Sequence, residues 1–149
     1  MTIIRNATLA DVPAIVRMSA QFYPTTHYAD WVAMDEDSVA DLATGLIADH
    51  VFLVAERDGQ LVGMAGVMLC PFLFNRNQLF AVEIVWWVAP EVRGTSIAHR
   101  LLRAIEQPCR DAGANRIQMV HMPNSPPQAA ALYERSGYLE SEISYTKDI

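Results

Sequence analysis

The sequence has little of what marks several other classes of protein. It holds two cysteines, Cys70 and Cys109, without CxxC or Cys/His spacing, so we expect neither a disulfide framework nor a metal site. No apolar run approaches the roughly 20 residues of a membrane-spanning helix, and residues 1–6 lack the basic and then apolar profile of a signal peptide. The expected location is therefore the cytoplasm, with no membrane as a partner.

Basic residues are also scarce. The chain has 11 lysines and arginines against 17 aspartates and glutamates, which gives a formal net charge of -6. Binding to nucleic acid requires concentrated positive charge facing the phosphates, so no nucleic-acid partner is expected. A cationic or amine substrate suits this charge better, although net charge mainly reports solubility.

Apolar residues, in contrast, are abundant. They make up 52% of the chain, against 19% for charged residues. A chain of 149 residues with this composition can bury a well-packed core, and it is short for two typical domains. We therefore expect a single domain over residues 1–149.

The pattern of apolar residues predicts an alternation of strands and helices. Residues 24–34 lack a clean period and are expected to form a loop that contributes to specificity, and Pro71 and Pro90 are expected to end strands. Pro108 is expected to kink or shorten a helix. The predicted elements are strands at 2–7, 51–56, 60–69, 79–88, 116–121 and 138–147, and helices at 8–23, 35–49, 96–112 and 127–136.

This order, β-α-α-β-β-β-α-β-α-β, predicts an α/β fold with a mixed central sheet flanked by helices. Asp58-Gly59 is a strong hairpin signal and favours an antiparallel pair around it. The strand-helix-strand unit in the C-terminal half predicts a parallel pair joined by a right-handed crossover.

The stretch from Glu83 to Ala98 holds a strand, a glycine turn and the start of a helix. The first turn of a helix presents unpaired N–H groups and the positive end of the helix dipole, so it can bind a pyrophosphate. Small residues at Gly94 and Ser96 let a ligand approach the backbone, and Arg93 adds charge. An ordinary strand-turn-helix connection has the same features, so the turn alone does not establish a pyrophosphate site.

Two motifs here resemble those of the GNAT acyltransferase superfamily, over nearly the whole chain and in the same element order. The family pattern Gln/Arg-x-x-Gly-x-Gly/Ala, after a strand ending in Val-x-Pro, reads Arg93-Gly94-Thr95-Ser96-Ile97-Ala98 after Val88-Ala89-Pro90, with Ser96 replacing the central glycine. The Leu-Tyr-x-x-x-Gly-Phe signature is matched by residues 132–138. The resemblance implies a sheet of six or seven strands and an acyltransferase that uses an acyl-CoA, most simply acetyl-CoA.

The resemblance also implies where the cofactor lies. The backbone of residues 86–88 would pair with the pantetheine arm where a β-bulge splays the strand from its parallel neighbour, and the Val88 amide would polarise the thioester. For Trp86 and Trp87, packing in the core is the alternative interpretation. The expected cofactor-binding residues are Trp86, Trp87, Val88, Arg93, Gly94, Thr95, Ser96, Ile97, Ala98, Asn124 and Tyr133.

Catalytic roles follow from the same resemblance. Glu83 interrupts an apolar strand and is similar to the family's general base, and Tyr133 is similar to its general acid. A surface charge and a packed tyrosine are the alternatives, and His99 and His121 rank below Glu83 as bases. The residues at the family's acceptor position are His27, Tyr28, Asp30 and Trp31.

The sequence therefore predicts an N-acetyltransferase that moves an acyl group directly to a small-molecule or protein amine, without a metal. A homodimer is compatible with the sequence, because the last strand offers an edge. Two alternatives stay open: a non-catalytic module of the same fold that binds acyl-CoA or a protein, and a nucleotide-binding α/β domain that uses the same turn.

Overall fold

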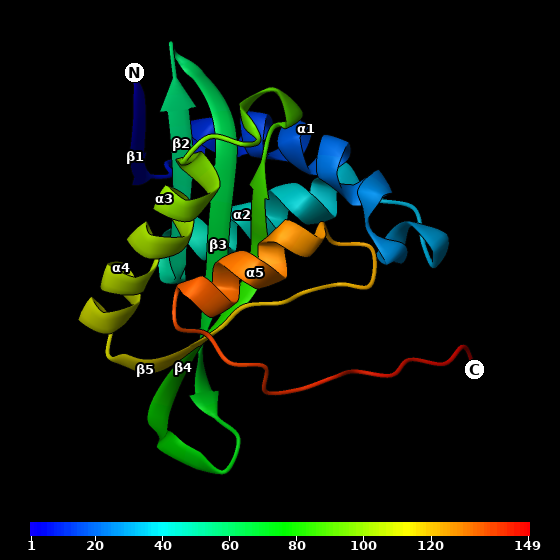
Figure 1. The fold of residues 1–149 in the computed structure, drawn as a ribbon, viewed down its shortest axis with the longest axis vertical. Helices are drawn as coiled ribbons and strands as arrows, with labels where there is room; N and C mark the ends of the chain where they lie inside the picture. Colours follow the sequence, from blue (N-terminus) through cyan, green and yellow to red (C-terminus); the bar gives the residue numbers. More distant parts are fainter.

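A twisted sheet with helices on both faces forms the body of the protein. A computed structural model describes residues 1–149, and Figure 1 shows α1 and α2 behind the sheet and α3, α4 and α5 in front of it. Every neighbouring pair of strands is antiparallel except the last, which is parallel. In spatial order the five strands are β1 (Thr2–Asn6), β2 (Val51–Arg57), β3 (Gln60–Phe72), β4 (Asn75–Val88) and β5 (Ala114–Gln118).

The helices follow the apolar spacing in the sequence. None of them is both long enough and apolar enough to span a membrane. The α-helices are α1 (Val12–Phe22), α2 (Glu36–Asp49), α3 (Ile97–Ala104), α4 (Glu106–Asp111) and α5 (Pro127–Arg135), and the short 3-10 turns are η1 (Leu9–Asp11), η2 (Tyr23–Thr25), η3 (His27–Asp30) and η4 (Pro90–Val92).

The core lies on both faces of β2 and β3. β2 is buried from Val51 to Ala55, because it is in contact with α2 and with α3, which lie on opposite faces of the sheet. Leu46 of α2 and Leu101 of α3 are almost completely buried on opposite faces. A strand that is covered on both faces has a continuous run of apolar residues in its sequence, and β2 has such a run.

The helix predicted over residues 96–112 is divided. α3 ends at Ala104 and α4 begins at Glu106. Pro108 has no N–H to donate to the carbonyl of Ala104 four residues earlier, so the helix cannot continue unbroken through this point. The expected effect of the proline is confirmed.

The prediction that Pro71 ends a strand was wrong. β3 continues to Phe72, and β4 begins at Asn75 rather than near residue 79, so the two strands form one long hairpin that projects from the body in Figure 1. β2 pairs with β3 only as far as Val67. Pro71 therefore lies where β3 has an open edge, and a missing N–H is tolerated there.

The C-terminal segment corrects the predicted strand count. The mixed α/β class is as expected, but the sheet has five strands rather than six or seven, and the strand predicted at 138–147 is absent. Residues 139–149 are all exposed and make no hydrogen bond. Their alternating pattern suits a strand, but a strand exists only where a partner edge takes its N–H and C=O groups. The strand predicted at 116–121 also lies earlier, at Ala114–Gln118.

Candidate active site

β4 and β5 separate halfway along their length, and the separation opens one edge of β4. β5 pairs only with Leu79 to Val82. On the other side, Glu83 and Val85 pair with consecutive residues of β3, so Ile84 is an extra residue in a β-bulge. From Glu83 to Val88 the edge of β4 that faces β5 consequently has no neighbouring strand, and an extended ligand can pair with it.

The two predicted catalytic side chains meet at a single backbone position at this separation. The Val120 N–H donates to Oε2 of Glu83 at 2.6 Å, and the Tyr133 hydroxyl donates to the Val120 carbonyl at 2.9 Å. Glu83 comes from β4, Val120 from the segment after β5 and Tyr133 from α5. Three separate segments therefore bring the predicted acid and the predicted base to one residue.

Burial adjusts the acidity of both groups. It raises the pKa of Glu83 to about 7, although the hydrogen bond from the Val120 N–H opposes the rise by stabilising the carboxylate. Burial and then the charge of Glu83 hold the pKa of the Tyr133 phenol well above its usual value. At neutral pH Glu83 therefore exchanges a proton readily, while Tyr133 stays protonated.

The two tryptophans of β4 have different environments. The Trp86 indole donates to the Ala98 carbonyl at 3.2 Å, and its ring lies 5.2 Å from that of Tyr133. Trp87 points into the core and is 6% exposed. The core-packing interpretation thus describes Trp87, whereas Trp86 joins β4 to α3 and α5.

The turn before α3 has free backbone donors. Gly94 has φ +80°, a conformation that other residues adopt only with strain, and the N–H groups of Gly94 and Ser96 have no partner in the protein. Thr95 donates its hydroxyl to the Val92 carbonyl at 2.6 Å, and the Arg93 guanidinium donates to the Val88 carbonyl at 3.3 Å. Free N–H groups at the positive end of a helix suit a phosphate.

A cleft of about 520 Å³ lies between this turn and α5. The cleft lies between α3, which holds Ala98, and α5, which also carries Tyr133. Its lining residues are Gly94, Thr95, Ala98, His99, Gln128, Leu132 and Arg135.

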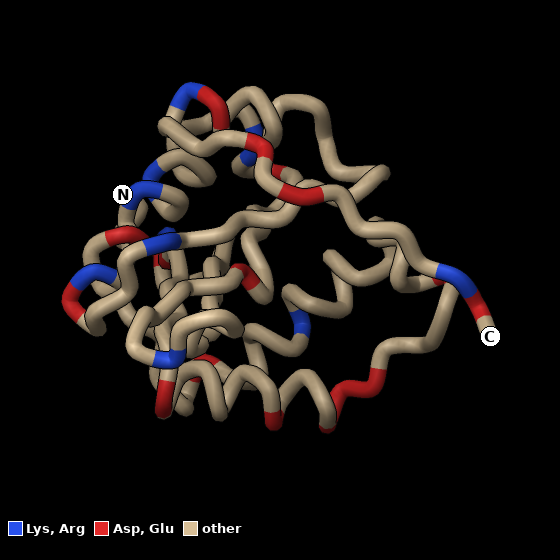
Figure 2. The backbone as a smooth tube through the Cα atoms, turned by 90° about the horizontal axis from the view of Figure 1, so that it is seen from below, with Lys and Arg blue, Asp and Glu red and all other residues tan.

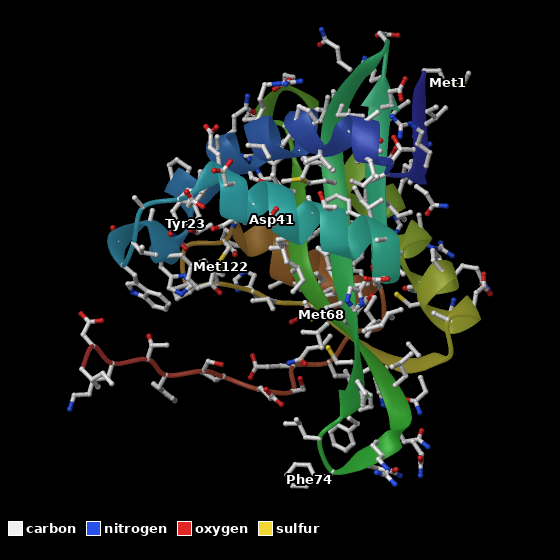
Figure 3. All side chains as sticks on the ribbon, turned by 180° about the vertical axis from the view of Figure 1, so that it is seen from behind. Met1, Tyr23, Asp41, Met68, Phe74 and Met122 are labelled. Atoms are coloured by element: carbon white, nitrogen blue, oxygen red, sulfur yellow. The ribbon has the colours of Figure 1, made fainter.

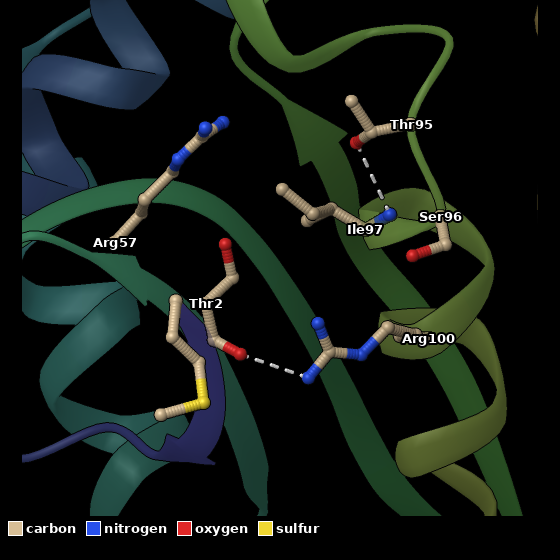
Figure 4. Close-up of a pocket in the computed structure, with 7 residues that line it drawn as sticks. Thr2, Arg57, Thr95, Ser96, Ile97 and Arg100 are labelled. Carbon is tan, nitrogen blue, oxygen red and sulfur yellow. Dashed lines mark hydrogen bonds between the residues drawn. The ribbon is translucent and has the colours of Figure 1, made fainter.

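A second groove, of about 440 Å³, lies on the β1 side of the same turn. Figure 4 shows Arg57 and Arg100 on opposite sides of it, with Arg100 donating to the Thr2 carbonyl at 2.9 Å. Ile97 N–H donates to the Thr95 hydroxyl at 3.4 Å. Because this groove is on the opposite side of α3 from α5, it does not lead to Tyr133.

The four predicted acceptor residues lie in η3 and the residue after it. His27, Tyr28 and Trp31 form an aromatic cluster, with His27 4.3 Å from Tyr28 and 4.9 Å from Trp31 between ring centroids. Trp31 is 50% exposed, and Asp30 is exposed beside it. Nδ1 of His27 is buried without a hydrogen-bond partner.

Asn124 connects the loop after β5 to the turn that precedes this cluster. Its amide donates to the Thr25 carbonyl at 2.7 Å, so it ties the loop after β5 to η2. The cofactor contact predicted for Asn124 stays a prediction. His121 bonds to the Pro126 carbonyl at 3.3 Å, whereas His99 lines the cleft beside α5.

Charged residues are spread over the backbone in Figure 2, and the positive ones do not gather in one patch. Two arginines nevertheless lie near the turn before α3. Arg93 is part of the turn, and Arg135 lines the adjoining cleft. The positive charge is thus placed where a phosphate is expected.

Comparison with known proteins decides the family. The model of the acetyltransferase (GNAT) family matches residues 13–138, most of the chain. The chain belongs to the acetyltransferase (GNAT) family. The enzyme class expected from the sequence, an N-acetyltransferase, is thereby confirmed.

Relatives of this GNAT protein include two curated enzymes. An aminoglycoside N(6')-acetyltransferase type 1 of Stenotrophomonas maltophilia is 29% identical over 144 residues, covering 93% of this chain and 87% of the relative. An aminoalkylphosphonate N-acetyltransferase of Salmonella typhimurium is 27% identical, covering 97% and 89%. The solved structure of a predicted acetyltransferase with acetyl-CoA from Clostridium acetobutylicum has a TM-score of 0.78 at 15% identity, covering 99% and 96%.

The residues of this GNAT protein fit an acyl-CoA. The open edge of β4 can pair with the amides of a pantetheine arm, and the free N–H groups at Gly94 and Ser96 can receive phosphates. Replacing the family's central glycine by Ser96 leaves that N–H free. A co-substrate of the acyl-CoA class is therefore supported.

Some site residues were not found from the sequence. The backbone of Val120 links Glu83 and Tyr133, and nothing in a side chain signals such a role. Gln128, Leu132 and Arg135 line the cleft together because they recur four and three residues apart in α5. That spacing was visible in the sequence, and it could have indicated Arg135 as a ligand-facing cation.

Proposed function

We propose that this GNAT protein is an acetyl-CoA-dependent N-acetyltransferase for a small-molecule amine, with Glu83 as general base and Tyr133 as general acid. The observation that carries the proposal is the link of both side chains to Val120, beside the open edge of β4. The proposal treats residues 1–149 as one catalytic domain.

Backbone groups and the α3–α5 cleft hold the co-substrate. Residues 86–88 pair with its pantetheine arm, the free N–H groups of Gly94 and Ser96 bind its phosphates, and Arg93 and Arg135 neutralise charge. When bound, acetyl-CoA supplies the acetyl group as a thioester. The Val88 amide is the proposed donor to the thioester oxygen.

Glu83 removes a proton from the acceptor amine, directly or through one water. A base with a pKa of about 7 is about half ionised near neutral pH and still takes up a proton, which suits general-base catalysis. Tyr133 stays protonated at neutral pH and delivers its proton to the leaving sulfur. The Val120 N–H and C=O groups keep the base and acid on one side of β4.

The aromatic cluster His27, Tyr28 and Trp31 contacts the acceptor. Exposed aromatic faces next to a carboxylate, here Asp30, suit a cationic ligand. Aminoglycosides and aminoalkylphosphonates, which the two curated relatives are named for, are therefore the first acceptors to test.

Release of free thiol from acetyl-CoA tests the proposal. We expect thiol release with at least one amine of a panel containing an aminoglycoside, an aminoalkylphosphonate and a polyamine, and little without an amine. We also expect acetyl-CoA to raise the melting temperature, whereas ATP and NAD do not.

Other outcomes identify the alternatives. A rise in melting temperature with acetyl-CoA, without turnover of any amine and without any change in Glu83→Gln, would indicate a non-catalytic acyl-CoA-binding module. A rise with ATP or NAD but not with CoA would indicate a nucleotide-binding domain and overturn the proposal.

A further inference from the structure

One hydrogen bond joins two segments that are far apart in the sequence: residues 23–32, which hold the aromatic cluster, and residues 119–126, which lead from β5 to α5. The Asn124 side-chain amide donates to the Thr25 carbonyl at 2.7 Å, across 99 positions. Figures 1 and 3, seen from opposite sides, both show the two segments side by side. No other hydrogen bond connects them.

The loop that carries Asn124 is held in shape by its own bonds. The Met122 N–H donates to the Ser125 hydroxyl at 3.0 Å, and the Ser125 N–H donates to the Met122 carbonyl at 3.0 Å. These bonds close a turn, and Pro123 within it and Pro126 after it restrict the backbone further. The turn therefore presents the Asn124 amide in a defined direction.

The segment that carries the aromatic cluster is also braced from within. The Tyr23 hydroxyl lies 3.0 Å from the Tyr28 carbonyl oxygen and 2.5 Å from that of Val32. Thr26 is 3% exposed, and its hydroxyl donates to the Tyr23 carbonyl at 2.8 Å. These bonds hold η2 and η3 to each other, and none of them reaches the catalytic residues. Without the bond from Asn124 we therefore expect the segment to keep its shape and to lose a constraint on its position.

The bond between Asn124 and Thr25 connects the two functional parts of the site. Val120, whose backbone contacts both catalytic side chains, is four residues before Asn124. His27, the first member of the aromatic cluster, is two residues after Thr25. Reacting atoms have to be held about 3–3.5 Å apart, so a small shift of the cluster relative to Glu83 changes how an acceptor amine is placed.

We propose that Asn124 is a positioning residue, which fixes the aromatic cluster relative to Glu83 and Tyr133 and so strengthens binding of the acceptor amine. This inference rests on the proposed function, because it takes the cluster as the acceptor site and the two side chains as base and acid. Without the bond, ordering of the segment adds to the cost of binding the amine, and weaker binding raises KM. In this role Asn124 contacts the acceptor segment, whereas the sequence predicted a contact with the cofactor.

Steady-state kinetics of Asn124→Ala test the role, with the amine of the panel that the unmodified enzyme acetylates fastest. A neutral hydrogen bond changes an equilibrium by about 2- to 10-fold, so we expect the KM for the amine to rise by about that factor, with kcat nearly unchanged. Calorimetric titration should give the same Kd for acetyl-CoA in both proteins.

Asn115→Ala is the matched control. It removes another exposed amide, one that donates to the Gln78 side chain and not to the acceptor segment. Its KM for the amine should equal that of the unmodified enzyme. Asn124→Gln keeps an amide donor on a longer side chain, so its KM for the amine should be lower than that of Asn124→Ala.

Two results would overturn the positioning role while the proposed function stands. One is an unchanged KM for the amine in Asn124→Ala. The other is a higher Kd for acetyl-CoA without a higher KM for the amine, which would assign Asn124 to the cofactor. If circular dichroism shows that Asn124→Ala is unfolded, Asn124→Asp decides by the same measurements, because it keeps the shape of the side chain but cannot donate.

Failure of the proposed function would give a different result. If the unmodified enzyme acetylates no amine, the roles of Glu83 and Tyr133 fall and the positioning role falls with them. If the unmodified enzyme is active and only the expected change in Asn124→Ala is missing, the positioning role alone is refuted.

Discussion

At the scale of single residues, the properties of Glu83 depend on one backbone amide and on the loss of solvent. The Val120 N–H favours the carboxylate, and burial favours the neutral acid more strongly, so the pKa rises to about 7. Active sites are where such shifts concentrate, because a catalytic base needs a pKa near the pH at which it works.

Replacing Glu83 should remove both activity and its dependence on pH. For the unmodified enzyme we expect kcat/KM to rise with pH up to about 7 and then level off, because only the ionised carboxylate accepts a proton. Glu83→Gln should lower kcat/KM by about 100-fold or more at alkaline pH and abolish this inflection. Measuring both proteins with the same amine cancels the ionisation of the substrate. An inflection that survives in Glu83→Gln would assign it to another group.

The same substitution should stabilise the fold at high pH. An acid whose folded pKa is raised contributes stability below its unfolded pKa, here 4.5, and loses it as pH rises through about 7. Above that range the unmodified protein keeps a costly buried charge that Gln lacks. We therefore expect the free energy of unfolding of Glu83→Gln, relative to that of the unmodified chain, to be higher at high pH than at low pH by up to about 3 kcal/mol. This figure takes about 1.4 kcal/mol for each unit by which the pKa is raised, and chemical denaturation at the two pH values measures it.

Tyr133 and Tyr138 provide a matched pair of phenols. The Tyr133 hydroxyl donates to the Val120 carbonyl, whereas the Tyr138 hydroxyl is buried without a partner, and the two rings lie 5.7 Å apart. We expect Tyr133→Phe to lower kcat by about 10- to 1000-fold with little change in acetyl-CoA affinity. Tyr138→Phe should leave kcat unchanged. Steady-state kinetics and ligand titration check both, and equal turnover in Tyr133→Phe would remove it from the acid role.

At the scale of elements, the start of α3 depends on a single backbone conformation. Gly94 turns the chain at φ +80° just before α3 begins, and it lines the cleft beside α5. No atom lies within 4 Å of the position a Cβ would occupy there. The requirement for glycine is therefore one of backbone conformation and not of space.

Two glycine-to-alanine changes should have opposite effects on stability. Gly94→Ala should cost about 1–2 kcal/mol or displace the turn, and should weaken acetyl-CoA binding by about tenfold. Gly45 lies inside α2 with no atom within 4 Å of an added Cβ, so Gly45→Ala should stabilise the protein by about 0.5–1 kcal/mol without changing affinity. Thermal unfolding and calorimetric titration measure both. Unchanged binding in Gly94→Ala would show that the turn does not hold the phosphates.

At the scale of the whole molecule, one arginine joins the first two strands of the sheet to η1. Arg5 of β1 donates to both carboxylate oxygens of Asp11, at 2.8 and 2.9 Å, and to Glu56 of β2 at 2.8 Å. The Thr8 N–H also donates to Asp11 at 2.7 Å. These bonds, led by the one from Arg5, hold the pKa of Asp11 well below its usual range.

Asp11→Asn should therefore destabilise the protein in a way that depends on pH. A lowered acid pKa contributes stability above the unfolded pKa of 3.8 and loses it as pH falls below that value. Near neutral pH the variant should lose about 1–3 kcal/mol of unfolding free energy, a range that allows for partial exposure. Chemical denaturation should show a smaller difference in unfolding free energy between the variant and the unmodified protein near pH 3 than at neutral pH. A constant difference would show that the loss is not electrostatic.

Local interactions explain why much of the fold could be predicted from the sequence. Helices that bury one face, the hairpin at Asp58-Gly59, the break near Pro108 and the glycine turn at Gly94 all follow from backbone preferences within a few residues. The motifs around Gly94 and Tyr133 likewise carried the family resemblance that the family model confirms.

Long-range pairing decided the rest. Whether Pro71 ends a strand depended on where β2 stops pairing with β3, and whether residues 138–147 form a strand depended on whether that segment meets a sheet edge. The meeting of Glu83 and Tyr133 at Val120 joins residues from three elements through backbone atoms, which all residue types share. The sequence by itself determined the local elements and the candidate side chains, and only the tertiary structure determined the edges and the backbone contacts that bring them together.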